Sequence, residues 1–129
     1  MKKIVAASFA LAVLVTGSTW AHHDMSAVFD VNQRFTVTGT LMKLDWRNPH
    51  IFLSVDVTGD QGQLETWLFE GQNPGAFRAK AIGKSDFVNS IDKTISVEAS
   101  LARDGSLLGL IRQITLADGT VVSACPQNC

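Results

Sequence analysis

Phe35-Thr36-Val37-Thr38-Gly39-Thr40-Leu41-Met42-Lys43-Leu44-Asp45-Trp46 is the stretch that decides the fold, because apolar and polar residues alternate over its 12 positions. Such a period of two places alternate side chains on opposite faces and is typical of a half-buried β-strand. Gly39 within it indicates a bulge or a sharp bend, which a barrel requires. We therefore predict a long, bent first strand.

The segments that follow have the same β-rich character. Turn-forming residues (Asn48-Pro49, Gly59 to Gly62, Asp104-Gly105 and Asp118-Gly119) separate further predicted strands at 50–57, 64–70, 94–101, 107–116 and 120–123. A short helix is predicted at 76–82, ended by Gly83, with a further helical turn at 85–88. Three strands, a helix and then two or three strands is the order of an OB-like barrel. We predict an all-β domain with one short helix, built as a five- to six-stranded antiparallel OB-like barrel; a small open β-sandwich is the alternative.

The first 21 residues have the pattern of a secretory signal peptide. Lys2 and Lys3 precede a 12-residue apolar run, and Ala21 stands at the expected cleavage position. The run is too short to span a membrane, which takes about 20 residues. Residues 22–129 are predicted to form one exported, periplasmic domain of 108 residues without a membrane span.

The charge of the predicted mature chain excludes one class of partner. Without Lys2 and Lys3 it has nine basic and twelve acidic residues, a net charge of −3. Nucleic-acid binding depends on a basic surface, which this composition does not offer. The expected partner is a periplasmic protein or a small ligand that the sequence does not identify.

The predicted mature chain begins with His22 and His23, which form the first candidate site. A terminal amine and an imidazole can chelate copper, and a second imidazole can complete the site. His50 is the only other histidine in the chain. The competing interpretation is an exposed polar terminus with incidental metal affinity.

A second candidate is the predicted first loop, with Trp46, Arg47, Asn48 and His50, because OB folds commonly bind ligands there. The alternative is structural: Asn48 makes the turn and Trp46 packs at the end of the barrel. Glu70, at the end of the third predicted strand, could point into the same region. Glu65 lies five positions earlier, so it faces the opposite side and the two do not form a paired-carboxylate site.

Cys125 and Cys129 close the sequence with three residues between them. In an oxidising compartment we predict a disulfide, and a thiolate pair for Cu(I) or Zn(II) is the alternative. No catalytic residues are predicted, since the chain lacks a recognisable nucleophile motif or phosphate loop.

The chain resembles a bacterial exported family of domains of unknown function, numbered six-one-five-two. The matching marks are Ala21-His22-His23, Phe29-Asp30, Thr38-Gly39-Thr40, Trp46-x-Asn48-Pro49-His50, Trp67, Glu70-Gly71 with Pro74, and Asp104-Gly105. The family often has serine where this chain has Asp24, and the two cysteines are not a mark of the family. The resemblance implies a small β-rich periplasmic protein without an established activity, and it supplies no catalytic residues.

These observations predict an exported, non-catalytic binding or accessory module. The alternative is a periplasmic copper-binding protein that uses His22, His23 and His50. An enzyme is the least favoured of the three hypotheses.

Overall fold

The computed structural model describes residues 24–124. In chain order the elements are α1 (Met25–Val28), β1 (Phe29–Asp45), β2 (Phe52–Thr58), β3 (Leu64–Glu70), α2 (Pro74–Arg78), α3 (Lys84–Val88), β4 (Thr94–Ala102), β5 (Leu108–Thr115) and β6 (Val121–Ser123). The predicted strand order is confirmed, and β3 has the predicted bounds.

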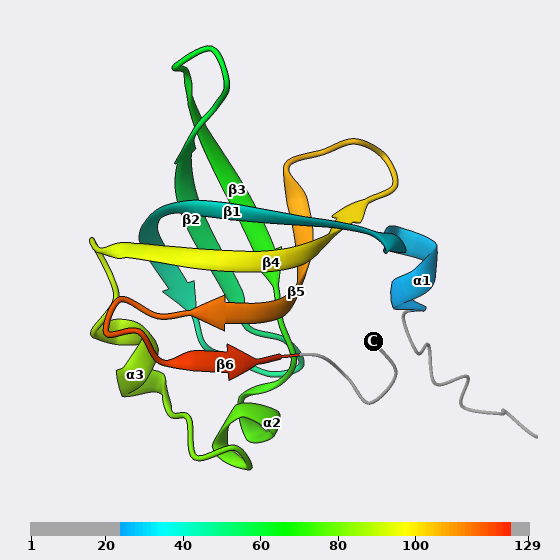
Figure 1. Cartoon of the computed structure of the whole chain (residues 1–129). Coiled ribbons are helices and arrows are strands. Elements are labelled where there is room, and N and C mark those ends of the chain that lie inside the picture. Colours follow the sequence, from blue (N-terminus) through cyan, green and yellow to red (C-terminus); the bar gives the residue numbers. More distant parts are fainter. Residues whose placement is uncertain (1–23, 125–129) are drawn as a thin grey trace, which may run out of the picture.

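Five strands are joined in a closed ring of pairings (Figure 1). β1 pairs antiparallel with β2 and β4, β2 pairs antiparallel with β3, and β4 pairs antiparallel with β5. A short parallel pairing of β3 with the start of β5 closes the ring, and β6 pairs with the end of β5 along the same edge, opposite β4. This mostly antiparallel ring, with helices between the third and fourth strands, fits the predicted OB-like class.

Because β1 bends, its first part pairs with β4 and its last part pairs with β2. Thr40 pairs with Thr94 of β4 and also with Asp56 of β2, so the strand changes partner directly after Gly39. A Cβ atom on Gly39 would lie 2.3 Å from the carbonyl oxygen of Asp56. The predicted bend therefore falls where two backbones approach too closely for any side chain. The strand begins at Phe29, six residues before the predicted start, with an irregularity between Asp30 and Arg34.

The first predicted helix, at 76–82, is α2 but lies earlier, at Pro74–Arg78, and the predicted helical turn at 85–88 is confirmed by α3. α2 ends at Arg78, because Ala81 takes a left-handed conformation with φ of 60° that a helix cannot continue through. Gly83 does not end that helix but precedes α3, where the Asp86 carboxylate accepts a hydrogen bond from the Gly83 N–H at 2.7 Å. α1 was not predicted, and Asp24 caps it by accepting the Ser26 N–H at 3.0 Å.

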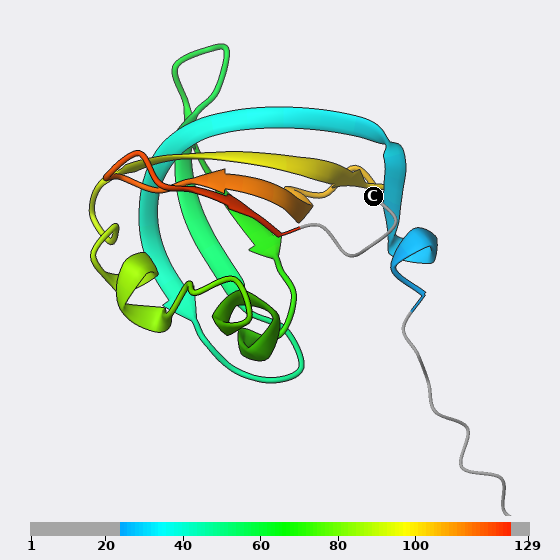
Figure 2. The same cartoon turned by 60° about the horizontal axis from the view of Figure 1, so that its bottom comes forward.

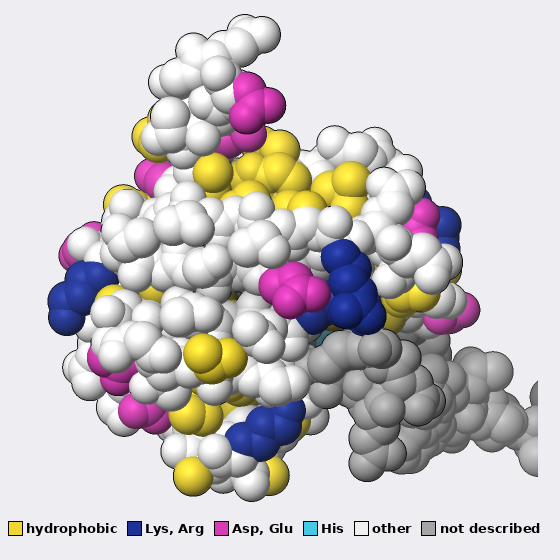
Figure 3. Space-filling view, in the orientation of Figure 1, with side chains coloured by type: hydrophobic (Ala, Val, Ile, Leu, Met, Phe, Trp, Pro, Cys, Tyr) yellow, Lys and Arg dark blue, Asp and Glu magenta, His cyan; other side chains and the backbone are white. Residues whose placement is uncertain are grey.

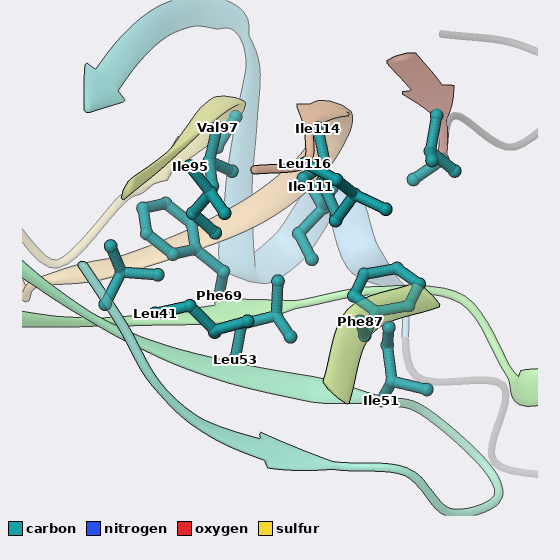
Figure 4. Close-up of a cluster of buried hydrophobic side chains, with 14 of the residues drawn as sticks. Leu41, Ile51, Leu53, Phe69, Phe87, Ile95, Val97, Ile111, Ile114 and Leu116 are labelled. Carbon is teal, nitrogen blue, oxygen red and sulfur yellow. The ribbon is translucent and has the colours of Figure 1, made fainter. Parts of the chain in front are cut away.

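The core fills the ring of strands and the space beneath the two helices (Figure 4). α2 and α3 lie at one end of the ring, and the β2–β3 hairpin projects from the other (Figure 2). Phe77 of α2 and Phe87 of α3 are fully buried, each with a burial free energy of about 1.5–3 kcal/mol. A smaller cluster of Phe29, Ala102 and Leu110 lies beside α1.

Candidate functional site

His50 and Glu70 are brought together by the pairing of β2 with β3. Phe52 pairs with Glu70, and the pairing extends beyond the strands through two backbone hydrogen bonds. The Gly71 N–H donates to the Ile51 carbonyl at 2.9 Å, and the Ile51 N–H donates to the Gln72 carbonyl at 3.1 Å. The backbone that directly follows His50 is therefore fixed relative to the end of β3.

The two side chains contact each other directly. Nδ1 of His50 is hydrogen-bonded to Oε1 of Glu70, and the side chains are 31% and 17% exposed. A neutral imidazole that donates its Nδ1–H to this carboxylate carries its free lone pair on Nε2. Metal-binding histidines are commonly oriented by a carboxylate in this way. In that tautomer, the contact with Glu70 orients the ring so that Nε2 could bind a ligand.

Two hollows of about 310 and 220 Å³ flank this pair, and Met25 lines both of them. The larger hollow is mostly apolar and is lined by Met25, Val28, Phe29, Pro49, His50, Phe52 and Glu70. The smaller is lined by Met25, His50, Gly71, Gln72, Asn73 and Leu110. A thioether, an imidazole and a carboxylate therefore share one region of the surface.

α1 holds Met25 in this region through contacts at both of its ends. The Ser26 N–H and hydroxyl donate to the Asp24 carboxylate and lower the pKa of Asp24. Arg103, beyond β4, donates from Nε to the Ser26 carbonyl at 2.9 Å and from its backbone N–H to the Val28 carbonyl at 2.9 Å. The helix is short, yet it is anchored at both ends to the rest of the fold.

The other residues of the predicted binding loop lie apart from His50. Trp46 turns inward and packs against Phe77 and Phe87, with ring centroids 5.7 and 5.3 Å apart. Arg47 is 69% exposed and pairs with Asp45 at 3.0 Å. Asn48 is exposed and is joined to Pro49 by a cis peptide bond. Arg47 instead borders a separate hollow of about 250 Å³ that also includes Lys43, Asp45, Phe52, Ser54 and Leu68.

Four of the predicted site residues lie outside the described range, namely His22, His23, Cys125 and Cys129. Their predicted roles stay predictions. Within residues 24–124 no group of three or more His, Cys, Asp or Glu side chains could hold a metal. The same range has no helix of the length and hydropathy needed to cross a membrane. The described part of the candidate site thus has one histidine, one carboxylate and one thioether.

Sequence reasoning missed Phe52 as a residue of this surface. It lies within the predicted second strand, and it lines the hollow at His50 and the one at Arg47. The signal was its position: Ile51, Leu53 and Val55 point inward and are fully buried, so Phe52 must face outward. Glu65 lies away from the pair and lines a different hollow, in agreement with its predicted opposite face.

Comparison with known proteins assigns the chain to a family. The model of a family of unknown function, DUF6152, matches residues 10–113. This range runs through β5 as far as Gln113 and includes both His50 and Glu70. No curated protein and no solved structure matches the chain. The chain belongs to DUF6152.

Proposed function

We propose that this member of DUF6152 is an exported, non-catalytic binding module of the periplasm, and that its ligand is one copper ion. The ion would be bound by Nε2 of His50 and by the amine and imidazoles of a mature terminus that begins at His22. Met25 would add a weak thioether ligand. Glu70 would remain on Nδ1 of His50 and orient the ring.

The single observation that carries this proposal is that Met25 lines both hollows around His50. His22 lies three positions before Met25 in the sequence. Three residues of extended chain span at most about 11 Å, so a terminus at His22 is within reach of the His50 ring. The fold thus provides the third imidazole that two adjacent terminal histidines lack.

The donor set favours copper over harder cations. Imidazole and amine nitrogens suit copper, which stands at the top of the affinity order for divalent first-row metals. A thioether is a soft ligand that favours Cu(I), so Met25 would support the reduced state as well. Magnesium and calcium prefer oxygen ligands, and Glu70 already accepts a hydrogen bond from His50.

The lining supports binding in preference to catalysis. The histidine–carboxylate pair could act as an acid or a base, but the described residues that line the two hollows include no serine, threonine or cysteine. The pair therefore has no adjacent side-chain nucleophile to activate. An oriented histidine without such a partner is the arrangement of a ligand-binding residue.

The test is a calorimetric Cu(II) titration of the mature protein and of three variants. His50→Gln should weaken binding at least tenfold, and Glu70→Gln should weaken it about 10–100-fold through loss of ring orientation. Arg47→Ala lies in the same loop but outside the pair, so it should leave the affinity unchanged. A synthetic peptide of residues 22–27 gives the affinity of the bare terminus. If His50→Gln binds as tightly as the parent protein, the proposed site is wrong.

A further inference from the structure

The outer edge of β3 is unpaired over its first half. β3 pairs with β2 along its whole length, but with β5 only from Leu68 to Glu70. The Leu68 N–H points away from β2 and donates to the Leu107 carbonyl at 2.9 Å. Because the direction of the backbone N–H and C=O alternates from one residue to the next, the N–H and C=O of Thr66, two residues earlier, also point away from β2. No described strand pairs with them there.

A cleft of about 400 Å³ lies at this end of the ring. Trp67, Val37 and Val57 provide its apolar surface, and the ring of Phe35 packs against Trp67 with centroids 4.8 Å apart. Figure 3 shows hydrophobic side chains gathered at the base of the projecting hairpin. An exposed aromatic and aliphatic surface beside a free strand edge is what an added strand requires.

The charge of the cleft is of one sign. Asp60 and Glu65 line it, together with the amides of Gln61 and Gln63, and none of its lining residues is basic. Gln63 donates to the Glu65 carboxylate at 2.9 Å and positions it. Glu65 and Trp67 are two residues apart and lie on the same face of β3, so an occupant that matches this face has a basic and an apolar side chain two positions apart.

We propose that the free edge of β3 binds an extended peptide segment in which a basic and an apolar side chain lie two positions apart, so that both point to the same face of the added strand as Glu65 and Trp67. Its backbone would pair with Thr66, its apolar side chains would lie on Trp67 and Val57, and its basic side chains would meet Glu65 and Asp60. A second copy of this chain fits less well, because pairing two β3 edges would bring the acidic residues of both copies together. This inference is independent of the copper site.

The probe is an acetylated, amidated peptide with the repeat Thr-Lys-Thr-Val, which puts lysine and valine on one face; it is titrated by calorimetry and by tryptophan fluorescence. Thr66→Pro removes the outward N–H, and the ladder with β2 does not use that group. Its matched control, Thr66→Val, keeps the N–H and removes the hydroxyl that donates to Asp56 at 2.6 Å. Glu65→Gln, which keeps the shape of the side chain, tests the charge separately. We expect binding at least tenfold weaker in Thr66→Pro than in Thr66→Val, and weaker binding with less salt dependence in Glu65→Gln.

Three results would overturn the proposal. One is equal binding of a peptide in which glutamate replaces lysine, since charge complementarity would then be absent. Another is equal affinity of Thr66→Pro and Thr66→Val, which would exclude backbone pairing at this edge. The third is a dimer in sedimentation that Thr66→Pro dissociates, because a second copy would then occupy the edge. If Thr66→Pro does not fold, Glu65→Gln and the glutamate peptide decide the question.

Discussion

Replacing Gly39 with alanine tests whether the close approach of β1 and β2 maintains the ring of strands. The added Cβ would lie 2.3 Å from the carbonyl oxygen of Asp56 and 3.0 Å from Cγ1 of Val55. Ordinary contact distances require the two strands to separate by on the order of 1 Å at this point. The nearest atom belongs to the backbone, so no side-chain rotation can relieve the overlap.

Overpacking of this kind costs about 1–3 kcal/mol, and the backbone contact places Gly39→Ala near the upper end, at about 3 kcal/mol. For a domain of this size that corresponds to a fall in Tm of about 12–24 °C. Thermal and urea unfolding measure the change. Gly83→Ala is the matched control, because its new Cβ would meet nothing closer than 3.8 Å. Its stability should stay within about 1 kcal/mol of the parent protein. Equal stability of the two variants would refute the account of the bend.

Two further predictions concern the first loop and the turns. Trp46→Ala should lower the free energy of unfolding by about 3 kcal/mol, because it removes the packing of Trp46 on Phe77 and Phe87. Arg47→Ala, at an exposed position, should change the free energy of unfolding by less than about 1 kcal/mol. Equal effects of the two substitutions in urea unfolding would contradict the inward placement of Trp46 and the outward placement of Arg47. The Thr120 N–H and hydroxyl donate to the Asp118 carboxylate and lower its pKa. The carboxylate therefore stabilises the fold at pH values above its pKa in the unfolded chain, about 3.9. This stabilisation is lost as the pH falls through the lower pKa of Asp118 in the folded protein. The stability difference between the parent protein and Asp118→Asn should therefore be constant above about pH 5 and shrink below about pH 4. A difference that does not change with pH would contradict this.

The sequence predicted the strands well because their signals are local. Alternation of apolar and polar residues defines a strand face without reference to the rest of the chain, and β3 has the predicted bounds. Gly39 is an informative glycine for the same reason, since an isolated glycine in a strand indicates a bend or a close approach. The consecutive polar residues Asn32, Gln33 and Arg34 interrupt the alternation, which explains why the start of β1 was predicted six residues late.

The ends of the helices and the arrangement of the site depend on features that local sequence patterns do not indicate. Ala81 takes a left-handed conformation although alanine favours helices, so the end of α2 before residue 82 could not be predicted from composition. The position of Glu70 at the end of the third predicted strand suggested that it could point toward the first loop, and its side chain contacts His50. The position of Met25 depends on contacts of α1 with Arg103, which is 78 residues away in the sequence. No local pattern indicates such a contact.

The most direct test of the copper proposal compares two forms of the protein, one that begins at His22 and one with a single alanine added before it. Both are titrated with Cu(II) by calorimetry, and the EPR spectrum of each is recorded. The proposal predicts tight one-to-one binding with a nitrogen-rich spectrum for the first form, and binding at least tenfold weaker with an altered spectrum for the extended form. Equal affinity and identical spectra in the two forms would contradict the proposal, since the terminal amine would then not be a ligand.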